Sequence, residues 1–347
     1  MKSWLITLLL IHAAFTSMPA ADTPPAPTPA THRLEILNFD SYMRVYMGWK
    51  TAAILSSNDT IRLPTQGKPP RDMKDVQTPP PPTGWIKPDF DDGFWAREHA
   101  PLRVEPWANG EYAAAEFHLI CARARFGVED PAQVKDLKLT LEYVGGAAVY
   151  LNGKEVKRGH LPGGELKADT LAERYPDEAY FDAEGFRMAD PKKDADRLAS
   201  RTRSIGNLAI PADLLVKGVN VLAIEIHRAP LIARYLEAKF KAVDYRGPSG
   251  VWSHAGLLGL SLSAESGAAV TPNTLRPAGI QVWAPRPHEF VLAWNYGDPC
   301  EKPAIRMIAA RNGTFSGCIV VSATNAVRGV QASAGDLAGQ GGKIPAS

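Results

Sequence analysis

Residues 149–156 have the sequence VYLNGKEV, in which an Asn-Gly pair separates two short runs of strand-forming residues. Asparagine and glycine both tolerate a positive φ, which a two-residue hairpin turn of type I′ requires at both central positions. The sequence therefore predicts a β-hairpin whose turn is formed by Asn152 and Gly153.

On both sides of this hairpin, apolar and polar residues alternate with the period of a half-buried strand. The pattern is clear in residues 137–143 and 43–49, and in 219–227 the leucine and isoleucines face the side opposite to the glutamate and histidine. Residues 258–262 predict a closing strand, and only residues 191–203 have a weak helical pattern. Many short strands and few helices favour an all-β sandwich.

The composition excludes several classes of protein. The chain has 347 residues with 39 basic and 37 acidic side chains, so it lacks the positive balance typical of nucleic-acid binding. Its 3 cysteines are too few for a disulfide scaffold. No apolar run reaches about 18 residues, the length of a membrane-spanning helix. We therefore expect neither a nucleic-acid partner nor a membrane span.

The first residues have the order of a secretory signal peptide. Lys2 supplies a positive charge, a short apolar stretch follows, and small residues at 17–21 offer a cleavage site. Residues 22–32 are a proline-rich linker. A buried N-terminal helix is the alternative. The directly following prolines favour a signal peptide at 1–21 and a protein that is secreted, periplasmic or extracellular.

The rest of the chain divides into two regions. Residues 33–265 contain the alternating strands and are expected to form one large sandwich with a long insertion at 159–205. Residues 271–277, TPNTLRP, have the composition of a linker. Residues 274–347 predict a second, smaller, Ig-like β-sandwich that is incomplete. Its expected strands are at 281–283, 289–294, 314–322 and 327–332.

Four motifs in order resemble the galactose-binding-like jelly roll, a sugar-binding accessory domain of β-galactosidase-type and rhamnosidase-type glycoside hydrolases. The first is GWIKPDFDDGFW at 84–95, and the second is the strand at 123–128. The hairpin at 149–156 and the strand region at 215–226 complete the series, which covers about half of the chain. The resemblance implies a jelly roll with a carbohydrate as partner.

Residues 276–347 more weakly resemble the β-sandwich that precedes the catalytic barrel in some large secreted glycosidase-like proteins. The motif NGTFSG at 312–317 carries this resemblance, together with Asp336-Leu337 and IPAS at 344–347. In that family the last motif introduces another strand. The resemblance implies either an N-terminal fragment of such a protein, with a catalytic domain downstream, or a stand-alone accessory protein.

Motifs that carry catalysis are absent from the sequence. It contains no HExxH, CxxC, GxSxG, P-loop or GxGxxG. Glycosidase chemistry needs two carboxyl groups about 5–10 Å apart, and no alternating βα pattern is present to place such a pair on a barrel. We expect no catalytic residues in this chain, and whether the whole protein is an enzyme stays open.

The acidic residues after Pro88 have two interpretations. Carboxylates in turns usually accept hydrogen bonds from backbone amides, so turn capping by Asp91 and Asp92 is the first. The second is a structural calcium ion held by Asp89 and Asp91, because hard cations prefer oxygen ligands.

Two of the cysteines could pair in an exported protein. A disulfide between Cys300 and Cys318 would close a short loop and stabilise it by roughly 3 kcal/mol. Cys121 lies among core positions and is expected to be a buried, inert thiol.

Sugar-binding sites place an aromatic ring against a pyranose and hold its hydroxyl groups with polar side chains. Long ordered loops are often functional, so the insertion segment RYPDEAY at 174–180 is the best candidate. Glu225 and His227 point the same way from one strand, either as ligand contacts or as a buried histidine bonded to its neighbour. Trp85 and Trp95 are expected in the core. The candidate ligand-binding residues are Tyr175, Tyr180, Arg174, Trp107, His227, Glu225, Tyr235 and Trp252.

The leading hypothesis is a non-catalytic module that holds a glycan or braces a catalytic domain against one. The first alternative is the accessory part of a glycoside hydrolase whose catalytic domain lies beyond Ser347. The second is an adhesion or structural protein whose jelly roll binds protein rather than sugar.

Overall fold

A computed structural model describes most of the chain after the expected linker. The signal peptide predicted at 1–21 and the linker at 22–32 lie outside the described residues. The described residues are 33–57, 60–62, 77–104, 113–187, 193–237, 252–265, 267, 269–286, 289–305, 308, 310, 313–333, 335–339 and 342–344.

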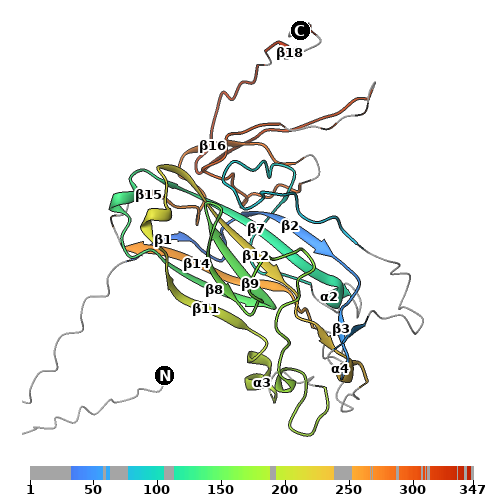
Figure 1. Ribbon diagram of the computed structural model, residues 1–347. Helices are drawn as coiled ribbons and strands as arrows, with labels where there is room; N and C mark the ends of the chain where they lie inside the picture. Colours follow the sequence, from blue (N-terminus) through green and yellow to red (C-terminus); the bar gives the residue numbers. More distant parts are fainter. Residues whose placement is uncertain are drawn as a thin grey trace, which may run out of the picture. The chain divides into compact units, whose positions relative to one another are not determined.

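The described residues contain many strands and a few short helices, so the all-β sandwich predicted from the sequence is confirmed (Figure 1). The strands up to the hairpin are β1 (Arg33–Leu37), β2 (Met43–Trp49), β3 (Ile54–Leu55), β4 (Ile61–Arg62), β5 (Ala96–Glu98), β6 (Leu102–Arg103), β7 (Phe117–Val128), β8 (Lys138–Val144), β9 (Gly146–Leu151) and β10 (Lys154–Gly159). The later strands are β11 (Arg203–Ala209), β12 (Gly218–His227), β13 (Leu231–Ile232), β14 (Gly256–Glu265), β15 (Val270–Thr271), β16 (Ile280–Trp283), β17 (Val320–Ala323), β18 (Leu337–Gly339) and β19 (Gly342–Ile344). The helices are α2 (Ala113–Glu116), α3 (Ala195–Ala199) and α4 (Ala233–Glu237), with 3₁₀ turns η1 (Pro131–Gln133), η2 (Asp177–Ala179) and η3 (Ala212–Leu214).

Two antiparallel sheets form the sandwich. The five-stranded sheet has the order β1-β14-β8-β11, with β6 also paired to β14. The seven-stranded sheet has the order β10-β9-β12-β7-β2-β5, with β15 paired to β7. A small sheet, β13-β3-β4, brings the chain after β12 beside the chain after β2.

The main core lies between the two large sheets, and the alternating side chains of strand β12 illustrate how it is filled. Leu222, Ile224 and Ile226 are fully buried in this core, as the sequence alternation predicted. Ala223 belongs to a second apolar cluster on the outer face of the seven-stranded sheet. Each buried leucine or isoleucine contributes about 1.5–3 kcal/mol. Because both faces of the sheet are covered, β12 is buried on either side.

The Asn-Gly hairpin is confirmed. Asn152 has a φ of 52° and Gly153 a φ of 82°, and β9 pairs with β10 directly beside the turn. The Asn152 side chain also joins the hairpin to its neighbours. Its Nδ2 donates to the Leu214 carbonyl at 2.9 Å and to Asn220 Oδ1 at 2.7 Å, while its Oδ1 accepts from the Val221 amide at 2.9 Å.

A row of arginines crosses the outer face of the seven-stranded sheet. Arg97, Arg44 and Arg123 stand opposite one another on β5, β2 and β7. Arg123 Nε donates to Asp92 Oδ2 at 2.6 Å, and Arg125 Nη2 lies 2.5 Å from Asp92 Oδ1. Asp92 thus anchors the 84–95 segment to the sheet by ion pairs, not by the turn capping that the sequence suggested.

The same arginines hold the chain that follows the sandwich. Arg44 lies 2.8 Å from Glu301, Arg125 lies 3.6 Å from Asp298, and Arg97 donates to the Tyr296 carbonyl. Beyond this attachment the described residues form two pairs of strands, β16–β17 and β18–β19. The strands expected at 289–294 and 327–332 are wrong, because these segments are irregular. The second sandwich stays a prediction.

Candidate functional site

The insertion after the hairpin covers the outer face of the seven-stranded sheet. Tyr175, Tyr180 and Trp252 are buried there, and Tyr235 joins them. The ring centroids of Tyr175 and Trp252 are 4.8 Å apart, and those of Tyr180 and Tyr235 are 5.3 Å apart. These four candidates therefore build an aromatic cluster beneath the insertion.

The two tyrosines of the insertion pack inside the protein. Tyr175 and Tyr180 are 0% exposed, so neither ring has a face for a sugar. The Tyr175 hydroxyl accepts from the Gly145 amide and donates to the Arg201 carbonyl, each at 2.9 Å. A long insertion stays ordered only if it buries apolar surface of its own, and these tyrosines supply it.

Glu225 and His227 also form an internal network. His227 is fully buried, with Nε2 3.0 Å from Glu225 Oε1 and Nδ1 3.0 Å from the Thr170 carbonyl. The Tyr150 hydroxyl donates to Glu225 Oε2 at 3.1 Å, and burial raises the pKa of Tyr150. Of the two interpretations of this pair, the buried histidine bonded to its neighbour is confirmed. The bond to Thr170 ties the insertion to β12.

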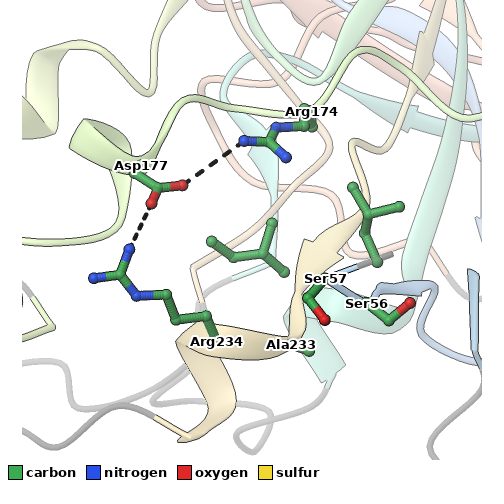
Figure 2. A pocket seen from close by; sticks show the side chains of 8 residues that line it. Ser56, Ser57, Arg174, Asp177, Ala233 and Arg234 are labelled. Carbon is green, nitrogen blue, oxygen red and sulfur yellow. Dashed lines mark hydrogen bonds and ion pairs between the residues drawn. The ribbon is translucent and has the colours of Figure 1, made fainter. Parts of the chain in front are cut away.

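A hollow of about 360 Å³ is lined by eight described residues (Figure 2). Of the predicted ligand contacts, Arg174 lines it. Its other charged groups are Asp177, which lies in the predicted segment 174–180, and Arg234. The remaining lining residues are Leu55, Ser56, Ser57, Ile232 and Ala233.

Three segments that are distant in sequence build this hollow. Residues 174–177 lead into η2, Arg234 lies on α4, and Ser56 and Ser57 follow β3. The parallel pairing of β13 with β3 brings the last two segments together. Arg234 also stacks on the Phe181 ring, with its guanidinium carbon 4.5 Å from the ring centroid.

The charged groups of the hollow face one another (Figure 2). Arg234 Nη1 donates to Asp177 Oδ2 at 2.6 Å, a close ion pair. Arg174 Nη2 lies 3.9 Å from Asp177 Oδ1, which is beyond hydrogen-bond distance. The side chains of Arg174, Asp177 and Arg234 are 54%, 45% and 61% exposed. Two cations and one anion give the described lining residues a net charge of +1.

The remaining candidates do not join this site. Trp107 lies outside the described residues. Asp91 Oδ1 accepts from the Gly93 amide at 3.0 Å, which agrees with turn capping. Within the described part of the chain no group of three or more His, Cys, Asp or Glu side chains could hold a metal ion. The structural calcium ion at Asp89 and Asp91 stays a prediction.

The cysteines are free in the structure. Cys300 is half-buried and Cys318 is exposed, and the possible disulfide between them is not present in the structure. Cys121 is fully buried, and burial raises the pKa of its thiol, which confirms an inert core residue. Trp85 and Trp95 are buried as expected. Within the described residues no helix is long and apolar enough to cross a membrane.

No known protein family matches the chain, and no curated protein matches it. Among solved structures it is similar to a β-glucuronidase of Bacteroides uniformis, with a TM-score of 0.32 and 15% identity over 74% of this chain and 20% of that chain. It is also similar to a β-glucuronidase of Bifidobacterium dentium complexed with coumarin-3-O-glucuronide, with a TM-score of 0.31 and 12% identity over 75% of this chain and 33% of that chain. A glycosyl hydrolase family 2 member from Bacteroides cellulosilyticus gives a TM-score of 0.29 and 13% identity over 73% and 23%. The chain thus spans a fifth to a third of these proteins, and the residues of the hollow, rather than this likeness, carry the functional conclusion.

Proposed function

We propose that this chain is a non-catalytic carbohydrate-binding module of an exported glycan-processing protein. The observation that carries the proposal is the hollow between the insertion, α4 and β3. Its volume of about 360 Å³ lies within the range of small-molecule sites, about 300–1,000 Å³. Guanidinium, carboxylate and hydroxyl groups line it together, which suits a ligand rich in hydroxyl groups.

Polar fixation is the binding mechanism that these residues support. Arg174 and Arg234 supply N–H donors for sugar oxygens, and Asp177 accepts hydrogen bonds from sugar hydroxyl groups. Leu55 and Ile232 supply apolar surface in place of the aromatic platform expected from the sequence. The buried Tyr175 and Tyr180 anchor the stretch of backbone from which Arg174 and Asp177 project.

The lining also supports a role without bond chemistry. Among the described residues that line the hollow, Asp177 is the one carboxylate. Glycoside hydrolysis uses two carboxyl groups, an acid and a base or nucleophile. We therefore assign the hollow to binding and not to catalysis.

Affinity electrophoresis of the folded chain tests this assignment. Gels are prepared with neutral and with charged polysaccharides, and at least one of these polysaccharides should retard the wild type. Arg174→Ala should be retarded less than the wild type in that gel. Lys217→Ala is the matched control, because Lys217 is an exposed cation that does not line the hollow. Migration unaffected by every polysaccharide would contradict the proposal, and so would equal retardation of wild type and Arg174→Ala.

A second candidate function is the bracing of a neighbouring domain. Large apolar side chains are exposed in the segment after the sandwich, with Leu275 at 74%, Phe290 at 86%, Trp294 at 71% and Ile308 at 81%. Soluble proteins rarely expose many such groups close together in one region unless it contacts another protein. Hydrogen exchange tests this role: residues 289–305 should be better protected in a polypeptide that joins a neighbouring domain to this chain than in this chain alone. Equal protection would contradict bracing.

A further inference from the structure

The guanidinium of Arg174 is available to donate hydrogen bonds to a ligand. Among the described residues its guanidinium donates no hydrogen bond, and its nearest acidic partner, Asp177, stays 3.9 Å away. Arg158 shows the contrast: its guanidinium donates to both oxygens of Glu155 at 3.0 and 2.7 Å and also to the Pro162 carbonyl. The Arg174 donors therefore face the hollow without a close acceptor.

The backbone at this position is nevertheless fixed. The Arg174 carbonyl accepts from Arg203 Nη2 at 3.1 Å, and the adjacent Tyr175 is fully buried. Asp177 is also held, because Arg234 binds it at 2.6 Å while stacking on Phe181. The backbone of Arg174 is thus fixed at the rim of the hollow, while its half-exposed guanidinium keeps its N–H donors for a ligand.

We infer that the hollow binds an anionic group of a saccharide, a carboxylate or a sulfate, with Arg174 as the bidentate donor and Arg234 as the supporting charge. This inference rests on the proposed carbohydrate-binding function and names the class of its ligand. A planar guanidinium forms two parallel hydrogen bonds with an oxyanion, whereas a neutral hydroxyl group accepts less strongly. The net charge of +1 on the described lining residues adds attraction for an anion.

A substitution of Asp177 distinguishes an anionic ligand from a neutral one by the direction in which the affinity changes. Its carboxylate neutralises part of the positive charge next to the site where the ligand's anion would bind. Asp177→Asn keeps the size of the side chain and raises the net charge of the lining from +1 to +2. The variant should therefore bind an anionic saccharide more tightly, whereas a merely structural role of Asp177 would weaken binding.

The test uses two matched pairs of polysaccharides in affinity electrophoresis of the full chain. Polygalacturonate and its methyl ester differ in the carboxylate, and dextran sulfate and dextran differ in the sulfate. We expect one charged polymer at least to be bound about tenfold more tightly than its uncharged counterpart. We expect this preference to be lost in Arg174→Gln, strengthened in Asp177→Asn and unchanged in Lys217→Gln. Raising the salt concentration should weaken it. Melting temperatures near that of the wild type confirm that each variant is folded.

The outcomes of this test distinguish the anionic ligand from carbohydrate binding in general. A preference for polygalacturonate identifies the carboxylate as the ligand group, and a preference for dextran sulfate identifies the sulfate. If neutral polymers are bound as tightly as charged ones, or if Asp177→Asn weakens binding, the anionic ligand is wrong while carbohydrate binding stands. If no polysaccharide is bound, the proposed function fails and the inference fails with it.

Discussion

Replacing Asp92 by asparagine should destabilise the whole sandwich. Asp92 is 2% exposed and is the shared counter-ion of Arg123 and Arg125, at 2.6 and 2.5 Å. Asparagine keeps the shape but removes the charge, so two buried guanidinium groups lose a close partner. Removing one member of a buried ion pair costs about 3–5 kcal/mol.

We expect the lower end of this range for Asp92→Asn. Arg123 keeps its bonds to the carbonyls of Trp85 and Lys87, and Arg125 keeps Asp298 at 3.6 Å. A loss of about 3 kcal/mol lowers the melting temperature of a domain of this size by roughly 6–12 °C. Trp85 lies in the anchored segment and is buried, so tryptophan fluorescence should report the same transition as circular dichroism.

Asp89→Asn is the matched control. Asp89 is an exposed carboxylate of the same segment, and the substitution makes the same change of charge. Its melting temperature should stay within about 2 °C of the wild type, since surface changes of this kind cost about 0.5 kcal/mol or less. Equal melting temperatures for Asp92→Asn and the wild type would refute the anchoring role of Asp92.

The other predictions concern stability at three further places. Burial lowers the pKa of His254 to about 3 and that of His118 to about 4, so both are neutral in the fold while the unfolded chain takes up protons below about 6.5. Above pH 6.5 these histidines therefore do not reduce the free energy of unfolding. As the pH falls to 5, proton uptake by the unfolded chain lowers that free energy by about 2 kcal/mol for each histidine. An equal melting temperature at pH 7 and pH 5 would contradict this. Asn152→Ala should cost about 2–3 kcal/mol, because it loses side-chain hydrogen bonds and must hold a positive φ. Asn152→Gly, which tolerates that φ, should cost less in the same thermal melt. Tyr180→Ala should cost about 3–5 kcal/mol by opening a cavity in the aromatic cluster, and a folded variant with unchanged stability would disprove its place in the core.

The parts of the fold with a regular period were predictable from the sequence. In β12, alternation alone placed Leu222, Ile224 and Ile226 in the core and Glu225 and His227 on the opposite face. The hairpin was predictable because its turn needs positive φ at two adjacent positions, which few residue pairs other than Asn-Gly accept.

The structure of the insertion was harder to predict from the sequence. An irregular segment has no regular period that distinguishes its buried side chains from its exposed ones. Tyr175 and Tyr180 were expected to meet a ligand, yet they fill the space beneath the loop. Arg174, predicted for the same reason, does line the hollow. Its charged neighbour Asp177 is 57 positions from Arg234, so their meeting depends on the fold and leaves no mark in local sequence.

The run from Arg174 to Tyr180 contains two kinds of position, which differ in how many substitutions they tolerate. Tyr175 and Tyr180 are buried and hold the loop, so substitution there threatens folding. Arg174 and Asp177 are about half exposed, as is Arg234 opposite them, and changes at these positions cost the core little. Descendants of such a chain can therefore exchange one ligand preference for another within a loop whose scaffold stays constant.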